Sequence, residues 1–248
     1  MTGSGAVGSA VGPAVLAAQL LVLAKAPVPG RVKTRLTPPF TPTQAAALAE
    51  AALGDTLAAV AATPVARRVL ALDGGPGPWL RPGFDVIPQR GAGLDERIAF
   101  ALADAWSGAP MPVVLIGMDT PQVTPGLLAA AAAPLVAGNA DAAFAFANDG
   151  GFWLLGMREI DVTLVLGVPM SRPDTGARQF ARLERAGLRV ARVANLTDVD
   201  TAQDAARVAA IRPDSLFSTR FRALHGAALV ASAEEVPLVR EHLATGGG

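Results

Sequence analysis

The chain has 248 residues, of which 51% are hydrophobic, and its 21 basic residues balance its 21 acidic ones. This length allows one large α/β domain or two small ones, and a net charge of zero argues against general nucleic-acid binding. Cysteine is absent and the two histidines, His225 and His242, lie near the C-terminus, which excludes disulfides and thiolate catalysis and disfavours histidine metal clusters and Ser-His-Asp chemistry.

Residues 1–18 are mostly small, and no positively charged stretch precedes their apolar part. We therefore expect a disordered tail rather than a signal peptide. In the rest of the chain no apolar run is long enough to suggest a membrane span. The expected location is the cytoplasm.

An apolar run over residues 20–24 is typical of a buried strand, and a positively charged loop follows it directly. The loop holds two prolines, Gly30 and the basic residues Lys25, Arg31, Lys33 and Arg35. A strand that leads into such a loop is how α/β proteins hold phosphate at the carboxyl end of a sheet, and Gly30 lets the backbone approach a ligand closely. The alternative is a solvated basic surface loop, because basic clusters are common on surfaces.

Strand and helix patterns then alternate as far as residue 212. We expect strands over 68–72, 84–87, 113–117, 142–147, 152–155 and 188–193, and helices over 42–62, 95–106, 125–138, 177–186 and 202–211. Thr41 opens the first helix with a capping-box pattern. The alternation predicts a mainly parallel sheet covered by helices on both faces, with one antiparallel excursion at the turn over 148–151.

The pattern changes after Pro213, where two helices are expected and Ser232 opens the second. We interpret residues 213–248 as a helical extension that packs on the main domain or on a partner. A homodimer through these helices is a further expectation.

Several carboxylates stand where strands are expected to end. Asp119 follows the clearest strand and is well placed to hold Mg²⁺ or Mn²⁺, although it could simply cap the turn that follows. Asp149 lies in an Asp-Gly-Gly turn that could bring it towards Asp119, or could be an ordinary hairpin turn. Asp198 and Asp200 flank a strand-to-helix junction, where Asp200 is either an N-cap or a further metal ligand.

Four blocks of sequence resemble, in order, the motifs of the DUF2064 family, which belongs to the glycosyltransferase-A (nucleotide-diphospho-sugar transferase) superfamily. These blocks are residues 24–36, 116–121, 148–156 and 198–201, and Leu94, Glu96 and Arg97 match a weaker one. The chain departs from the family at Asp95, where members often have Gly, and at 170–172, which replace a block that often contains Trp.

The resemblance implies a GT-A fold, a Rossmann-like α/β/α sandwich over residues 19–212, with a nucleotide above the first strand. It implies that Asp119 and Asp149 face a metal, with Asp200 as a further candidate ligand. Catalytic roles would then fall to Lys33, Asp119 and Asp149. The nucleotide would be held by the predicted binding set of Lys25, Gly30, Arg31, Lys33, Arg35 and Arg97.

Three functions remain open at this level. The first is a metal-dependent glycosyltransferase that uses an NDP-sugar, with Ser171, Asp174 and Thr175 facing the acceptor. The second is a nucleotidyltransferase that moves NMP from an NTP to a small phosphorylated or enolic acceptor and releases pyrophosphate, which suits the three or four cations of the loop. The third is a non-catalytic nucleotide-binding module.

Overall fold

The computed structural model describes residues 14–234, with side chains described as far as residue 226. Its centre is a seven-stranded sheet in the order β3-β2-β1-β4-β6-β5-β7. The strands are β1 (Leu16–Lys25), β2 (Val65–Asp73), β3 (Asp85–Pro88), β4 (Val113–Gly117), β5 (Ala142–Phe146), β6 (Phe152–Met157) and β7 (Val190–Arg192). Only β6 runs antiparallel to its neighbours, so the predicted single excursion in a parallel sheet is confirmed.

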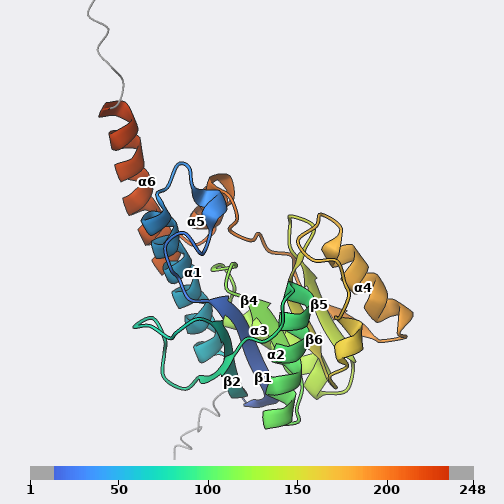
Figure 1. The fold of residues 1–248 in the computed structure, drawn as a ribbon. Helices are drawn as coiled ribbons and strands as arrows, with labels where there is room; N and C mark the ends of the chain where they lie inside the picture. Colours follow the sequence, from blue (N-terminus) through green and yellow to red (C-terminus); the bar gives the residue numbers. More distant parts are fainter. Residues whose placement is uncertain (1–13, 235–248) are drawn as a thin grey trace, which may run out of the picture.

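Helices cover both faces of this sheet (Figure 1). They are α1 (Pro42–Ala62), α2 (Leu94–Gly108), α3 (Pro125–Val136), α4 (Thr175–Arg185), α5 (Ala202–Ile211) and α6 (Leu216–Glu234), with short 3₁₀ turns η1 (Thr34–Leu36) and η2 (Val162–Leu164). Side chains of α1 and α3 share one core cluster with the sheet, and those of α2 and α4 share the cluster on the opposite face. The architecture is the expected α/β/α sandwich.

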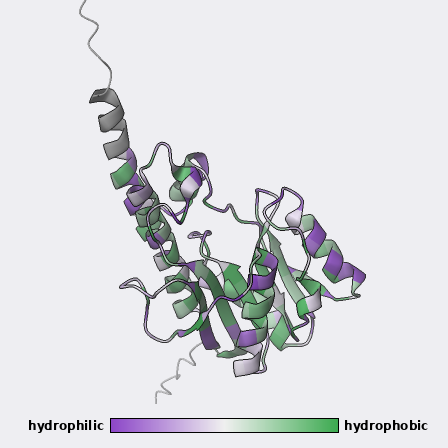
Figure 2. Ribbon diagram, in the orientation of Figure 1, coloured by the Kyte–Doolittle hydropathy of each residue, from purple (hydrophilic) through white to green (hydrophobic). Residues whose placement is uncertain are grey.

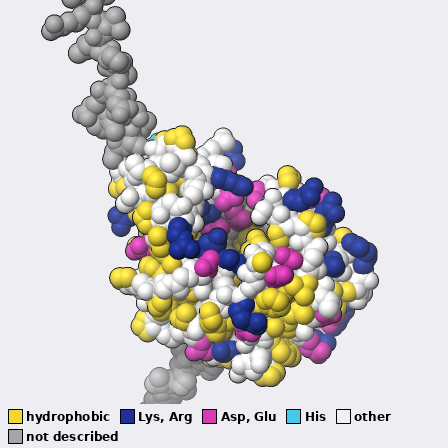
Figure 3. Space-filling view, viewed as in Figure 1, with side chains coloured by type: hydrophobic (Ala, Val, Ile, Leu, Met, Phe, Trp, Pro, Cys, Tyr) yellow, Lys and Arg dark blue, Asp and Glu magenta, His cyan; other side chains and the backbone are white. Residues whose placement is uncertain are grey.

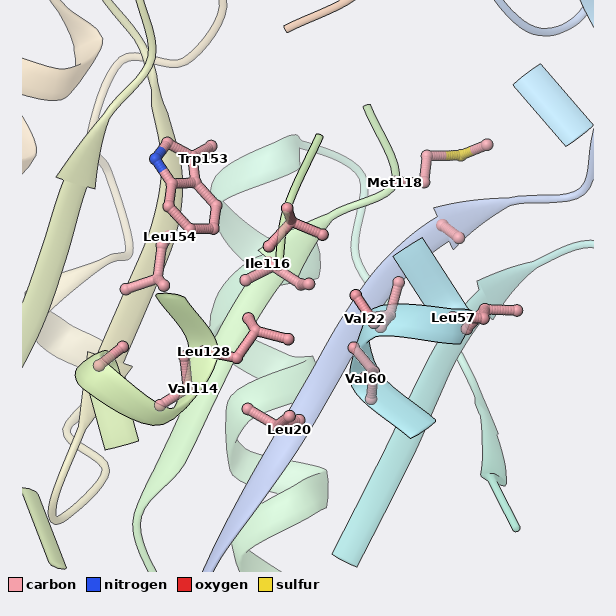
Figure 4. Packing of buried hydrophobic residues seen from close by; sticks show 14 of the residues in the cluster. Leu20, Val22, Leu57, Val60, Val114, Ile116, Met118, Leu128, Trp153 and Leu154 are labelled. Atoms are coloured by element: carbon pink, nitrogen blue, oxygen red, sulfur yellow. The ribbon is translucent and has the colours of Figure 1, made fainter. Parts of the chain in front are cut away.

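Alternation along the strands builds the two cores. In β1, Leu20 and Val22 point to the face covered by α1, while Leu21 between them points to the face covered by α2. Figure 4 shows Leu20 and Val22 beside Leu57 and Val60 of α1. Each such fully buried aliphatic side chain contributes roughly 1.5–3 kcal/mol. In Figure 2 much of the sheet is accordingly coloured green, as hydrophobic.

Helix α1 is buried on two sides, because α5 and α6 pack against the face turned away from the sheet. Leu48 and Ala52 of α1 lie in one cluster with Phe217 and Phe221 of α6. Asp55 of α1 accepts hydrogen bonds from the first backbone amides of α6, at 3.1 and 2.8 Å. By length and composition α1 could cross a membrane, but 67% of its apolar window is buried inside the fold, as in a core helix.

Several predicted boundaries differ from the structure by a few residues, and two differences concern the ends of the main domain. Strand β1 begins at Leu16, so residues 16–18 belong to the sheet and not to the tail; residues 1–13 lie outside the described part. Helix α6 runs without a break through Ser232, where a second helix was expected to begin. The alanine-rich sequence before Ser232 favours a continuing helix over a turn. The remainder of the expected hairpin, 235–248, lies outside the described residues.

Candidate functional site

The site lies where the order of the strands reverses. After β1 the chain builds β2 and β3 on one side, and β4 then pairs with β1 on the other. The loops that follow β1 and β4 therefore leave the carboxyl ends of two adjacent parallel strands at this point. In open α/β sheets ligands bind at such switch points.

Lys33 brings these two loops together. Its Nζ lies 2.9 Å from Asp119 Oδ1 and 3.0 Å from Asp200 Oδ1. The Lys33 side chain is only 9% exposed, whereas the two carboxylates are 37% and 34% exposed. Burial by itself lowers the pKa of Lys33, but the two negative charges outweigh it and raise that pKa above its usual value. The sequence predicts that Lys33 and Asp119 bind the same ligand, and in the fold their side chains are in direct contact.

The backbone of the loop is built to point Lys33 inward. Lys33 adopts a left-handed conformation with φ 48°, which costs a non-glycine residue about 1–2 kcal/mol and is found most often at functional sites. Val32 and Leu36 on either side are buried in the core and fix the loop. Gly30, with φ 74°, forms the turn at the start of the segment that leads to Lys33.

Residues 193–201, which we call the crossing segment, carry Asp198 and Asp200 back over the sheet from β7 to α5 (Figure 1). Gln122 and Trp153 hold it, by donating side-chain hydrogen bonds to the carbonyls of Thr197 at 2.7 Å and Ala194 at 3.1 Å. The Val199 amide donates to the carbonyl of Asp119 at 2.9 Å. These contacts explain how residues so distant in sequence reach Lys33.

The N-cap interpretation of Asp200 is wrong. The cap of α5 is Thr201, whose hydroxyl accepts a hydrogen bond from the Asp204 amide in a full capping box. Asp200 is thereby free to pair with Lys33 and, at 3.4 Å, with Arg35. The Arg35 side chain is 73% exposed, so this second pair is weak.

The site holds more negative than positive charge. Asp198 is partly buried, and its pKa is raised to about 8 first by this burial and then by the charges of Asp119 and Asp149; Lys33 offsets only part of that effect. At neutral pH the Asp198 carboxyl therefore keeps its proton. A carboxyl whose pKa is perturbed by burial and by neighbouring charges is a candidate functional-site residue.

Asp149 lies in the turn between β5 and β6, and it does serve that turn, since its Oδ1 accepts a hydrogen bond from Gly151 at 2.9 Å. The turn also packs on the loop before α4. Gly150 has φ 92°, its carbonyl accepts from the Gly176 amide at 2.8 Å, and a Cβ at Gly150 would overlap the carbonyl oxygen of Pro173. Asp149 is thus held on a rigid turn near Asp198.

The remaining predicted phosphate ligands differ in availability. Lys25 and Arg31 are exposed and make no ion pair within the described part of the chain. Arg97 instead pairs with Asp73 at 2.7 Å, which neutralises its charge. On the face of the molecule seen in Figure 3, basic and acidic side chains gather around a hollow near the centre.

On the predicted acceptor side, Thr175 is buried and cannot face a ligand. Its hydroxyl donates to the Pro169 carbonyl at 2.8 Å and accepts from the Arg172 amide at 3.0 Å, which closes its own loop. Asp174 pairs with Arg178 at 2.6 Å. The hydrogen bond from Arg178 lowers the pKa of Asp174. Ser171 is exposed and left-handed, with φ 58°.

The departure at Asp95 has a structural role. Its Oδ2 accepts a hydrogen bond from the Gly167 amide at 2.9 Å and so ties the start of α2 to the acceptor-side loop.

Gln122 and Trp153, which support the crossing segment, were not predicted as site residues. Trp153 lies within the motif block 148–156, and Gln122 directly follows the block 116–121.

The chemistry of the donors fits a hard cation, because Asp119, Asp149 and Asp200 offer only oxygen atoms. No group of three Asp, Glu, His or Cys side chains is already assembled for a metal within residues 14–226. Mg²⁺ does not require such a group, since it commonly takes one or two carboxylates and completes its shell with water and substrate phosphates. The arrangement thus suits a cation that arrives with further ligands.

Comparisons with known proteins agree with the fold. The family model of an uncharacterized protein conserved in bacteria, DUF2064, matches residues 49–172. A phosphoenolpyruvate guanylyltransferase of Sanguibacter keddieii is 31% identical over 228 residues, which cover 75% of this chain and 78% of that protein.

Solved structures give the same picture. A protein of Desulfovibrio desulfuricans G20, provisionally assigned as a nucleotide-diphospho-sugar transferase, superposes with a TM-score of 0.74 at 27% identity, over 88% of this chain and 95% of that one. The Rv0371c homologue of Mycobacterium sp. strain JC1 shares the fold, with a TM-score of 0.50 at 23% identity, over 78% of this chain and 96% of that one.

These similarities make the chain a transferase of the nucleotidyltransferase or nucleotide-diphospho-sugar transferase type, and the non-catalytic alternative is set aside. Because the family model spans half of the sequence and the motif blocks are present in order, the protein belongs to the DUF2064 family.

Proposed function

We propose that the protein is a nucleotidyltransferase, which moves a nucleoside monophosphate from an NTP to a small anionic acceptor and releases pyrophosphate. The observation that carries this proposal is the Lys33–Asp119 contact of 2.9 Å at the switch point. Nearby, Lys25 at the end of β1 and Arg31 in the following loop form no ion pair with any described residue. Basic groups beside an oxygen-only acid cluster match the needs of a triphosphate that brings a divalent cation.

The reaction is a displacement at phosphorus. An oxygen of the acceptor attacks the α-phosphorus of the NTP, and a new P–O bond forms. The bond from that phosphorus to the oxygen bridging to the β-phosphate breaks, and pyrophosphate leaves with the electron pair. Lys25 and Arg31 would hold the β- and γ-phosphates and stabilise the charge that gathers on them.

A divalent cation fits the same scheme. Asp119 and Asp200, with Asp149 nearby, would hold Mg²⁺ or Mn²⁺, which supplies charge neutralisation on phosphate oxygens when bound. The rigid turn around Gly150 and the hydrogen bonds on the crossing segment keep these carboxylates in place without substrate. Such preorganisation is what an electrostatic site needs.

The acceptor is proposed to be a small phosphorylated acid such as phosphoenolpyruvate, and the nucleotide GTP. The guanylyltransferase relative motivates both choices. Within this chain, Arg172 lies in the loop packed on the Asp149 turn, and its side chain is 61% exposed. Its Nε lies 3.7 Å from Asp174, a long and exposed ion pair that an anion can replace. Ser171 beside it can add a hydrogen bond.

Transfer from an NDP-sugar is the second candidate, favoured by the Desulfovibrio structure with its TM-score of 0.74. The two reactions differ in their products. The full chain is incubated with Mg²⁺ and either each NTP plus phosphoenolpyruvate, or NDP-sugars plus small acceptors. We expect pyrophosphate and a mass-verified nucleotidyl product from GTP only when the acceptor is present. Release of NDP from an NDP-sugar, without pyrophosphate from any NTP, would replace our proposal with the second candidate.

A further inference from the structure

Lysine is used at two positions in the 248 residues, Lys25 and Lys33, and every other basic side chain except the histidines is an arginine. Lys25 is the last residue of β1, and Lys33 lies in the loop that follows. A lysine ammonium is a compact point charge, whereas the arginine guanidinium is a broad planar fork. A point charge is what fits between the single oxygens of two different carboxylates, and Lys33 is found in that setting.

We propose that Lys33 is a placeholder cation: its ammonium occupies the position between Asp119 and Asp200 in the nucleotide-free protein and leaves it when a divalent cation arrives. This inference rests on the proposed function, because it assumes that a metal enters with the nucleotide. It assigns to Lys33 a second role besides phosphate binding, and it fixes the order in which the site assembles.

Geometry favours exchange of the two cations over their coexistence. The Asp119 and Asp200 oxygens that face inward are both in contact with Nζ, at 2.9 and 3.0 Å. Asp119 and Asp200 would hold Mg²⁺ through the oxygens that now contact the ammonium, and two cations so close together would repel each other strongly. Both carboxylates are about one third exposed, so a cation can reach them from solvent.

The burial of Lys33 leads to the same conclusion. With 9% of its side chain exposed and two carboxylates on its ammonium, Lys33 is poorly placed to meet a phosphate from solvent. Because Val32 and Leu36 anchor the backbone, the side chain rather than the loop is the part that must move. A metal that takes over the carboxylates would release Nζ towards the phosphates that accompany it.

The absence of a ready-made group of three metal ligands within residues 14–226 fits this order. A metal ion alone must displace Lys33 and gains only two carboxylates. A metal ion with a triphosphate displaces the same group and brings phosphate oxygens of its own. We therefore expect weak binding of the metal alone.

Acetylation of the two lysines tests the exchange in the unmodified protein. The full chain is treated briefly with acetic anhydride at several Mn²⁺ concentrations, and acetylation of Lys25 and Lys33 is followed by peptide mass spectrometry. Without metal, Lys33 should react at least about tenfold more slowly than the exposed Lys25, because its ammonium is buried between two carboxylates. Saturating Mn²⁺ should accelerate Lys33 severalfold and leave Lys25 unchanged.

A direct binding measurement provides the second test. Free Mn²⁺ is counted by electron paramagnetic resonance in titrations of wild type, Lys33→Met and Arg35→Ala. Removal of the buried charge should tighten Mn²⁺ binding more than about tenfold. Arg35→Ala removes a cation that also faces Asp200 but is 73% exposed, so it should change the affinity less than about threefold.

Two outcomes would overturn the proposal: Mn²⁺ that binds without accelerating Lys33, and Mn²⁺ that binds folded Lys33→Met no more tightly than the wild type. The acetylation needs no variant, so it decides the matter even if Lys33→Met fails to fold. Pyrophosphate release from GTP together with unchanged Lys33 reactivity would leave the proposed reaction standing and remove only the placeholder role.

Discussion

Two charged clusters lie at opposite ends of the parallel strands, one at their carboxyl ends and one at their amino ends. The inner cluster, at the carboxyl ends of β1 and β4, consists of Lys33, Asp119, Asp149, Asp198 and Asp200. The outer cluster, beside the first residue of β5, consists of Asp141, Arg158 and Arg189. Both are composed of Asp and basic residues at short distances, yet the pKa of one Asp is raised to about 8 in the inner cluster and the pKa of the other is lowered to about 2 in the outer cluster.

The difference comes from the balance of charge and from burial. Asp141 receives hydrogen bonds from the Arg189 side chain and backbone, and the Arg158 charge is added to these, so its negative form is well stabilised. Asp198 is partly buried near several other carboxylates that share one buried ammonium. The outer cluster has two arginines for one carboxylate and needs no further cation, whereas the inner cluster has several carboxylates around one buried ammonium and can accept a positive ligand. The number of ion pairs does not distinguish them.

Replacing one carboxylate in each cluster should give the largest contrast. Asp119→Asn removes the charge that faces both Lys33 and the proposed cation, and we expect transferase activity to fall by at least about 100-fold. Asp141→Asn should leave activity within about twofold, because Asp141 lies at the opposite end of the parallel strands and touches no site residue. Product formation under saturating substrate, with circular dichroism as a check on folding, measures both.

Equal losses of activity in the two folded variants would mean that the two ends of the parallel strands do not differ in function. Intact activity in Asp119→Asn would remove the inner cluster from the reaction.

Two exposed arginines provide a smaller contrast in binding. Arg31 is unpaired within the described residues, whereas Arg90 forms a bidentate pair with Asp104 and lies over the Phe100 ring. Arg31→Ala should weaken nucleotide binding by about 1–3 kcal/mol, as expected for lost charge-assisted hydrogen bonds. Arg90→Ala should leave affinity unchanged. Isothermal titration calorimetry with GTP and Mg²⁺ compares them, and equal affinities for wild type and Arg31→Ala would exclude the loop from phosphate binding.

Most of the fold was predictable, because its signals are local. Strand β4 has the predicted bounds, 113–117, since a continuous apolar run ends at Gly117. Helix α1 begins at its predicted cap, where the Thr41 hydroxyl accepts from the Gln44 amide. The approach of Lys33 to Asp119 was also predictable, because the carboxyl ends of neighbouring parallel strands meet at one edge.

The rest of the site depends on the path of the crossing segment, which has no local signal. Hydrogen bonds from Gln122 and Trp153 decide that Asp200 reaches Lys33, and these join residues far apart in sequence. The wrong prediction for Thr175 has a similar cause. A polar residue at the start of a helix suggests a ligand contact, but the preceding loop folds back on itself. The Pro169 carbonyl and the Arg172 amide of that loop are therefore the hydrogen-bond partners of the Thr175 hydroxyl.

The dependence of stability on pH is the finest test of the contrast between the clusters. For Asp198, with a pKa of about 8 in the folded protein against 3.8 as the ordinary value, the folded state retains a proton that the unfolded state releases. Its contribution to the free energy of unfolding is therefore complete below about pH 4 and is lost as the pH rises from 4 to 8. For Asp141, with a pKa of about 2, the contribution is complete above about pH 4 and is lost as the pH falls towards 2.

Urea denaturation of the metal-free protein from pH 3 to pH 9, with a chelator present, separates the two effects. Asp198→Asn should flatten the decline of stability between pH 4 and 8 and leave the acid limb alone, because an amide in that position has no proton to lose. Asp141→Asn should do the reverse. If Asp198→Asn kept the full decline, the protons that leave between pH 4 and 8 would belong to another group, and the inner cluster would not carry the excess of negative charge that sets it apart from the outer one.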